Sequence, residues 1–144
     1  MLKTFLVEDE VVIREMIKKM IPWEQYGFEL AGEASDGEMA LPLILKSKPD
    51  LLITDIKMPF MDGIELIKNV MHNDISLKTI IFSGYNEFEY AKLAVKLGVK
   101  DYILKPVDPS EFSSTITGVI TELDEEHKKD EDYNRQANFI KQYY

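Results

Sequence analysis

The sequence has no cysteine and a deficit of basic residues. The lack of cysteine excludes disulfide bonds, thiolate catalysis and zinc sites built on cysteine. Lysine and arginine number 17 against 26 aspartate and glutamate residues, which gives a net charge of -9. A surface that binds duplex DNA needs a stripe of Lys and Arg side chains against the phosphates, and none is visible. Any contact with DNA is therefore expected through a partner or a domain missing from this chain.

Long apolar runs are also lacking. The amino-terminal run is interrupted by Lys3 and by the acidic residues 8–10, and no stretch approaches the roughly 20 residues that a membrane-spanning helix needs. We therefore predict a protein without membrane contact, located in the cytoplasm. A length of 144 residues suits one globular domain with a core of its own.

Strand and helix patterns alternate along the chain. Short apolar runs predict five strands, at 2–7, 28–34, 51–54, 79–82 and 100–104. Apolar residues at helical spacing predict intervening helices at 11–21, 37–46, 63–71 and 87–97, followed by a last helix from Pro109. Asp36 is a predicted N-cap of the second helix, in which Pro42 is expected to cause a kink or a late start.

This alternation predicts an α/β fold. Strands that are apolar along their length and joined by helices are typical of a parallel sheet covered on both faces. Right-handed crossovers leave few topologies. The best fit is a flavodoxin-like, doubly wound sheet of five parallel strands in the order 2-1-3-4-5, with an extended C-terminal helix. In such a sheet ligands bind at the carboxyl ends of the strands, near the switch point between strands 1 and 3.

Reactive side chains follow the ends of four apolar runs. In chain order they are Glu8 and Asp9, Asp55, Ser83 and Lys105. Because the carboxyl ends of parallel strands share one edge, three carboxylates, a hydroxyl and an ammonium would meet there. Each residue alone also fits an ordinary role as a cap, a turn residue or a surface lysine. Together they are typical of a magnesium-dependent phosphoryl site, since Mg²⁺ prefers oxygen ligands and an ammonium neutralises phosphoryl charge.

Four motifs in this order resemble the receiver domain of two-component response regulators. They are LVEDE at 6–10, DIKMPFMDG at 55–63, SGY at 83–85 and YILKP at 102–106. The strand order given above is also that of receivers, so it is not an independent prediction. The stretches around Trp23 and from Ser83 to Val107 look like receivers joined to an AraC-type helix-turn-helix domain. That resemblance implies a transcription regulator whose DNA-binding part is missing here.

The resemblance implies a role for each site residue. Asp55 is the expected phosphoacceptor, Lys105 the lysine that neutralises phosphoryl charge, Ser83 the hydroxyl switch and Tyr102 the aromatic switch. The implied partner is a sensor histidine kinase. The chain would be no enzyme, but a phosphoacceptor that takes part in its own phosphorylation and dephosphorylation.

The resemblance also implies a Mg²⁺ site. The expected ligands are Glu8, Asp9, Asp55 and the backbone carbonyl of Lys57. Glu8 stands where many receivers have aspartate, and its extra methylene would shift it to a water-mediated contact with the metal. Glu10 is instead expected to cap the helix at 11–21.

Three other functions fit part of the pattern. A phosphatase of the haloacid dehalogenase type also uses an aspartate after a strand, but its motif is DxD, and Lys57 stands in place of the second aspartate. A flavin carrier on the same fold needs a loop rich in Ser, Thr and Gly after strand 1, where the acidic residues 8–10 would repel phosphate. A phosphorylation-independent interaction domain stays open, although the complete set of site residues argues against it.

The carboxyl-terminal segment has a 4,3 spacing of mostly apolar residues from Phe112 to Tyr144. We predict a receiver domain at 1–123 and a helical linker at 124–144 toward an absent output domain. A frayed acidic linker is the alternative, because Glu126 and Asp130 occupy this spacing in a charge-rich stretch. Beyond Leu123 the apolar stripe has no domain to cover it, so a weak homodimer through this helix is expected.

Overall fold

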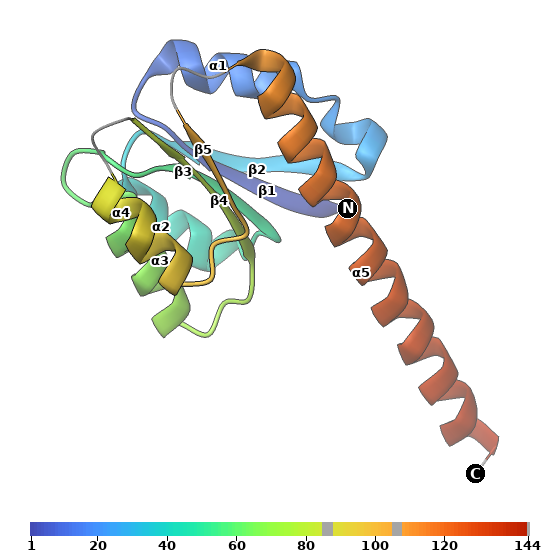
Figure 1. The fold of residues 1–144 in the computed structure, drawn as a ribbon. Coiled ribbons are helices and arrows are strands. Elements are labelled where there is room, and N and C mark those ends of the chain that lie inside the picture. Colours follow the sequence, from blue (N-terminus) through green and yellow to red (C-terminus); the bar gives the residue numbers. More distant parts are fainter. Residues whose placement is uncertain (85–87, 105–107, 144) are drawn as a thin grey trace.

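The computed structural model describes residues 1–84, 88–104 and 108–143 (Figure 1). The strands are β1 (Leu2–Val7), β2 (Phe28–Ala34), β3 (Leu51–Asp55), β4 (Lys78–Ser83) and β5 (Asp101–Leu104). The helices are α1 (Val11–Met20), α2 (Gly37–Ser47), α3 (Gly63–His72), α4 (Phe88–Lys96) and α5 (Pro109–Tyr143), with a short 3₁₀ helix η1 (Trp23–Tyr26). The predicted strands and helices are confirmed to within a few residues at their ends, whereas the sequence does not predict η1.

All five strands are parallel, in the order β2-β1-β3-β4-β5. This confirms the predicted topology and places the switch point between the hydrogen-bonded neighbours β1 and β3. Helices α1 and α5 cover one face of the sheet, and α2, α3 and α4 cover the other (Figure 1). Because both faces are covered, the strands are apolar along most of their length.

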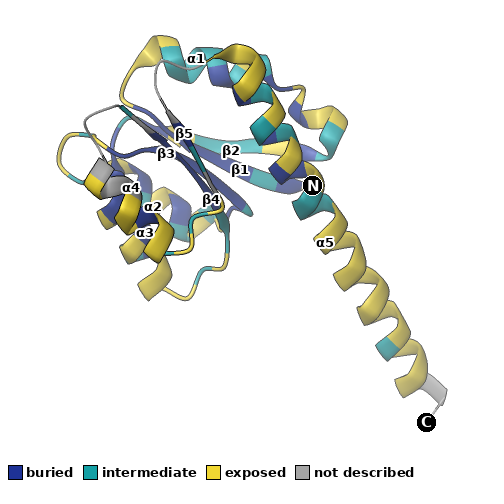
Figure 2. Ribbon diagram, in the orientation of Figure 1, coloured by how far each residue is buried: buried dark blue, intermediate teal, exposed yellow. Residues whose placement is uncertain are grey.

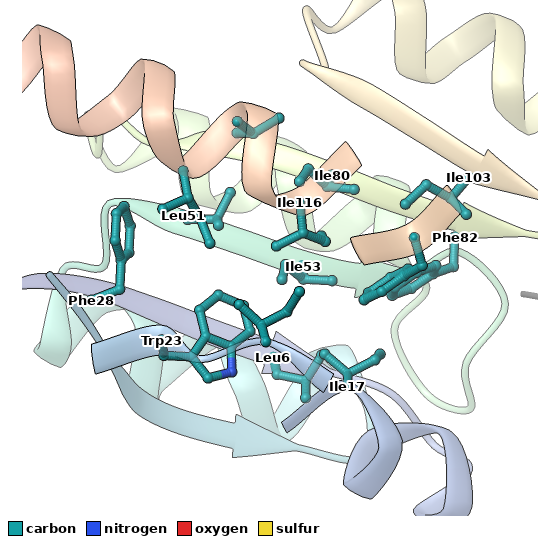
Figure 3. Close-up of a cluster of buried hydrophobic side chains, with 14 of the residues drawn as sticks. Leu6, Ile17, Trp23, Phe28, Leu51, Ile53, Ile80, Phe82, Ile103 and Ile116 are labelled. Carbon is teal, nitrogen blue, oxygen red and sulfur yellow. The ribbon is translucent and has the colours of Figure 1, made fainter. Parts of the chain in front are cut away.

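The core consists of two apolar clusters, one on each face of the sheet. Along β3 successive side chains point to opposite faces. Leu51 and Ile53 join the cluster under α1 and α5, which Figure 3 shows, whereas Leu52 joins the cluster under α2, α3 and α4. Phe82 stacks on Phe112 of α5 with ring centroids 5.1 Å apart. Burial of each such side chain contributes about 1.5–3 kcal/mol, so apolar packing fixes both helical layers on the sheet.

Two aspartates cap helices on the α2–α3 side. Asp36 accepts a hydrogen bond from the Met39 N–H at 2.8 Å, which confirms the predicted N-cap of α2. Asp62 accepts one from the Glu65 N–H at 2.8 Å and caps α3 in the same way. Helix α2 begins at Gly37 and continues through Pro42, so the expected late start is wrong.

Helix α5 continues well beyond the sheet. It has 35 residues and a length of about 52 Å. Its first turns bury Phe112, Ile116 and Val119, whereas nearly all of its residues after Asp124 are exposed on a part that projects from the domain (Figure 2). The predicted helical form of this segment is therefore confirmed as far as Tyr143. In the part of the chain that the structure describes, no helix combines the length and apolar character needed to cross a bilayer.

Candidate functional site

Strands β1 and β3 end side by side at the switch point of the sheet. Val7 pairs in register with Thr54, so the next residues, Glu8 and Asp55, leave the two strands at the same edge. The Glu8 N–H donates to the backbone oxygen of Ala34 at 3.1 Å, which also ties the end of β1 to β2. The predicted acidic residues therefore lie at the edge where open α/β sheets bind ligands.

The carboxylates that converge at this edge are those of Glu8, Asp9 and Glu10. One oxygen from each lies within 4.8 Å of the other two. Glu8 is fully buried, whereas Asp9 and Glu10 are exposed. Oxygens bound to one Mg²⁺ lie roughly 3 to 4 Å apart, because the bonds are about 2.0–2.1 Å long. Three carboxylate oxygens within 4.8 Å of one another are therefore compatible with a donor set for Mg²⁺.

The Glu10 side chain has a different role from the one that the sequence suggests. It occupies the N-cap position of α1, but its side chain makes no capping hydrogen bond. Its backbone N–H instead donates to Oε1 of Glu8 at 3.2 Å. The expected capping role is thus right for the backbone position and wrong for the side chain, which joins the acidic cluster of residues 8–10.

Asp55 ends the central strand β3 and is buried, with 4% of its surface exposed. Its Oδ1 accepts a hydrogen bond from the Ile56 N–H at 2.8 Å, which offsets part of the cost of burying a carboxylate. In the described chain the group of three convergent carboxylates does not include Asp55. The structure therefore places Asp55 on the strand next to the cluster, where the sequence predicts that it would share a metal site with Glu8 and Asp9.

The loop after Asp55 is anchored at both of its ends. The Ile56 N–H donates to the backbone oxygen of Phe82 at 3.2 Å, and the Gly63 N–H donates to that of Ile56 at 2.7 Å. A Cβ atom at position 63 would collide with the backbone oxygen of Asp55, so this close approach needs glycine. The side chain of Lys57 is exposed, which is compatible with a role for its backbone carbonyl alone.

Two of the remaining predicted residues, Ser83 and Tyr102, belong to β4 and β5. Strand β4 ends at Ser83, whose backbone pairs in register with Leu104. Tyr102 is half-buried and packs against the cluster under α2, α3 and α4. The side chain of Ser83 and the whole of Lys105 lie outside the described residues, so their roles stay predictions.

Arg14 of α1 also contacts the backbone of the acidic cluster of residues 8–10. The sequence alone does not identify Arg14 as a site residue. Its Nη1 donates to the backbone oxygen of Glu8 at 2.8 Å. Its Nε lies 3.7 Å from Oε1 of Glu33 on β2, and the Arg14 side chain is only 15% exposed. The contact has no signal in the sequence, because it depends on how α1 folds back over the end of β1.

Lys18, one turn further along α1, fixes the position of Glu33. Its Nζ lies 2.9 Å from Oε1 of Glu15 and 2.9 Å from Oε2 of Glu33. The hydrogen bonds to Glu15 and Glu33 raise the pKa of Lys18, and the bond from Lys18 lowers the pKa of Glu15. Partly exposed pairs of this kind contribute little to stability, but they order the side chains beside Arg14.

The chain matches known proteins over most of its length. The response regulator receiver domain family matches residues 4–117. YesN of Bacillus subtilis, named as an uncharacterized transcriptional regulatory protein, is 44% identical over 131 residues, which are 90% of this chain and 36% of that protein. The chain spans about a third to a half of the length of the curated relatives that it matches.

Two solved structures share both sequence and fold with this chain. The REC domain of AraT, a response regulator from Geobacillus stearothermophilus, is 37% identical, with a TM-score of 0.78 over 90% of this chain and 98% of that one. A two-component transcriptional regulator AraC from Clostridium phytofermentans is 32% identical, with a TM-score of 0.75 over 90% of this chain and 99% of that one. The match therefore extends past residue 117 into the first turns of the projecting part of α5.

Proposed function

The chain belongs to the response regulator receiver domain family, and on that premise we propose that Asp55 accepts a phosphoryl group from a sensor histidine kinase. The observation that supports this most is the place of Asp55. It is buried at the end of the central strand, next to the strand that carries the acidic cluster, at the switch point of the sheet. In this proposal the chain is a phosphoacceptor that takes part in its own phosphorylation and dephosphorylation, and not an enzyme that turns over a separate substrate.

We propose Mg²⁺ as the cofactor of this reaction. Glu8, Asp9, Asp55 and the Lys57 carbonyl would hold the ion, and Glu10 is a further candidate because its carboxylate belongs to the cluster. When bound, the ion would supply positive charge to the equatorial phosphoryl oxygens. The convergence of oxygen donors at one edge supports the assignment.

The reaction would proceed by direct attack of Asp55. A carboxylate oxygen forms a bond to phosphorus while the bond from phosphorus to the histidine nitrogen of the kinase breaks, and that nitrogen keeps the electron pair. The Ile56 N–H orients the carboxylate before attack. Lys105 would neutralise the phosphoryl oxygens, since an ammonium near developing negative charge lowers the barrier.

Phosphorylation would then change the surface formed by α4, β5 and α5. We propose that the Ser83 hydroxyl donates to a phosphoryl oxygen and draws its loop inward, which frees space for Tyr102 to turn. The register between Ser83 and Leu104 supports a coupling of β4 to β5. The half-buried position of Tyr102 is compatible with such a rotation.

The relatives support a role in transcription. YesN is named as a transcriptional regulatory protein, and the structure from Clostridium phytofermentans is named as a two-component transcriptional regulator AraC. We propose a cytoplasmic protein with a receiver domain at 1–123 and a helical linker at 124–144. DNA would be contacted only through an AraC-type helix-turn-helix domain that is absent here. The exposed stripe of α5 would support a weak homodimer.

Phosphorylation of the whole chain by a small phosphodonor tests the acceptor. Acetyl phosphate with Mg²⁺ should add one phosphoryl group, measured as intact mass, and Asp55→Asn should add none. Asp62→Asn is the matched control, because it removes one carboxylate from the same loop and asparagine also caps helices. Equal labelling of Asp55→Asn and the wild type contradicts the proposal.

Calorimetric titration with magnesium chloride tests the metal site. Asp9→Asn should weaken Mg²⁺ binding steeply, since a lost charged ligand in a site of a few carboxylates removes a large part of the binding energy. Glu10→Gln should weaken binding only if the Glu10 carboxylate contacts the ion. Unchanged binding in Asp9→Asn contradicts the assignment of this cluster.

A further inference from the structure

Arg14 places a permanent positive charge behind the acidic cluster. A guanidinium stays protonated at any pH at which the protein is folded. Its Nη1 bonds to the backbone oxygen of Glu8, the residue whose carboxylate is fully buried within the cluster of residues 8–10. The side chains of Arg14 and Glu8 are both largely withdrawn from water, so water and salt screen their charges less than those of a surface pair.

Carboxylates that each place an oxygen within 4.8 Å of the others repel one another when no cation is bound. A fixed cation bonded to the backbone of one of these residues offsets part of this repulsion. The same cation also repels an incoming Mg²⁺, because it contributes positive potential at the place where the ion binds. The charge of Arg14 therefore has opposite effects on the metal-free and the metal-bound states.

We infer that Arg14 is a positioning residue that holds the metal-free acidic cluster together and keeps its affinity for Mg²⁺ low. It bonds to the Glu8 carbonyl, replaces part of the charge that the metal would supply, and leaves the ion free to exchange. The inference rests on the proposed magnesium site and adds a residue that touches neither the metal nor the phosphoryl group.

A merely structural role for Arg14 leads to a different result. The guanidinium joins α1 to the end of β1 and lies 3.7 Å from Glu33 on β2, so its loss would loosen the acidic turn. A looser turn would hold its ligands less well, and Mg²⁺ would then bind more weakly or equally well. The sign of the change in magnesium affinity therefore separates the two roles.

The test is a calorimetric titration of the whole chain with magnesium chloride. Arg14→Gln removes the charge and retains a side-chain donor for the Glu8 carbonyl. Arg14→Lys retains the charge but lacks the planar guanidinium group. Lys18 still holds Glu33 in both variants. Lys19→Met is the matched control, because it makes the same change in net charge on the exposed side of the same helix.

The magnesium dissociation constant should fall roughly three- to tenfold in Arg14→Gln and stay near the wild-type value in Arg14→Lys and Lys19→Met. Thermal unfolding gives a second readout. Arg14→Gln should lower the Tm more without magnesium than with it, whereas a purely structural loss would lower both Tm values alike. Rescue of folding by magnesium supports the inference only if magnesium raises the Tm of Arg14→Gln more than that of the wild type, since any ligand of the native state stabilises a destabilised variant.

Two results overturn the inference in ways that can be told apart. Wild type that binds Mg²⁺, together with Arg14→Gln of equal or weaker affinity, overturns the role of Arg14 and leaves the proposed function in place. Wild type that binds no Mg²⁺ overturns the metal assignment, and the inference with it.

Discussion

The two parts of helix α5 have one spacing of apolar residues and differ in what covers it. From Phe112 to Val119 the stripe packs on the sheet, and Phe112 is 0% exposed. From Tyr133 to Ile140 the same spacing faces solvent, with Tyr133 71% and Ile140 56% exposed. A helical spacing therefore predicts the helix, whereas neighbouring elements decide whether its apolar stripe is core or surface.

The projecting part stays helical without a sheet beneath it. An isolated helix of about 20 residues is only marginally stable in water, because its first turn is costly to form. Here that turn is already formed in the domain, so each further residue only has to extend the helix. Pairs along its surface, such as Lys128 with Asp124 at 3.1 Å and Arg135 with Asp132 at 2.7 Å, add small increments.

The largest expected contrast comes from shortening one phenylalanine in each part. Phe112→Ala removes a buried ring that stacks on Phe82, so it should lower the free energy of unfolding by about 3–5 kcal/mol. Phe139→Ala, in the exposed part, should change it by less than about 0.5 kcal/mol. Urea unfolding of both variants measures the difference. Equal losses would show that the projecting part is also packed against something.

Removal of the projecting part should separate helix content from domain stability. A chain ending at Asp124 should lose helical signal in far-UV circular dichroism that corresponds to the residues up to Tyr143. The loss of the exposed Lys78–Glu126 pair should lower the free energy of unfolding by about 1 kcal/mol at most. A truncated chain with undiminished helical signal would mean that this segment is not helical in solution.

Self-association should depend on the residues at the 4,3 spacing of α5 and not on the total apolar surface of the helix. Ile140 lies on the 4,3 spacing and Phe139 does not, yet both are more than half exposed. Ile140→Glu should abolish the weak association that we propose, and Phe139→Glu should leave it unchanged. Sedimentation at several concentrations measures both variants. A monomeric wild type at every concentration contradicts the proposed homodimer.

Sequence alone predicts most of the fold, because the signals are local. Apolar runs mark the strands, helical spacing marks the helices, and Asp36 marks a cap that the structure confirms. Side chains at strand ends, such as Asp55, are placed correctly at the edge of the sheet once the strands are known to be parallel. The sequence is weaker where one residue has two possible roles, as at Pro42, which is tolerated inside α2.

The features that the sequence does not predict depend on contacts between elements. Arg14 reaches back across the α1–β1 turn, and the carboxylate of Glu10 lies within 4.8 Å of those of Glu8 and Asp9 although its backbone occupies a capping position. Ile120 is fully buried although it lies off the 4,3 spacing, because a sheet covers a wider strip of a helix than a second helix does. Such contacts follow from packing geometry, for which one sequence without structure holds no direct signal.

The smallest expected effect lies where the two parts of α5 meet. Lys100, just before β5, bonds through Nζ to Oε1 of Glu122 at 2.7 Å. This bond lowers the pKa of Glu122 below its ordinary value of 4.5. A carboxyl group whose pKa is lower in the folded state stabilises the fold above its unfolded pKa, and the effect disappears as the pH falls through the folded pKa. Lys100→Met should therefore lower the Tm slightly at about pH 7, and its difference from the wild type should shrink as the pH falls below 4.5. Lys96→Met, which makes the same change in net charge at an exposed position of α4, is the control. Thermal unfolding across this pH range measures all three proteins, and a gap between wild type and Lys100→Met that stays constant with pH would show that the pair does not tie α5 to the sheet electrostatically.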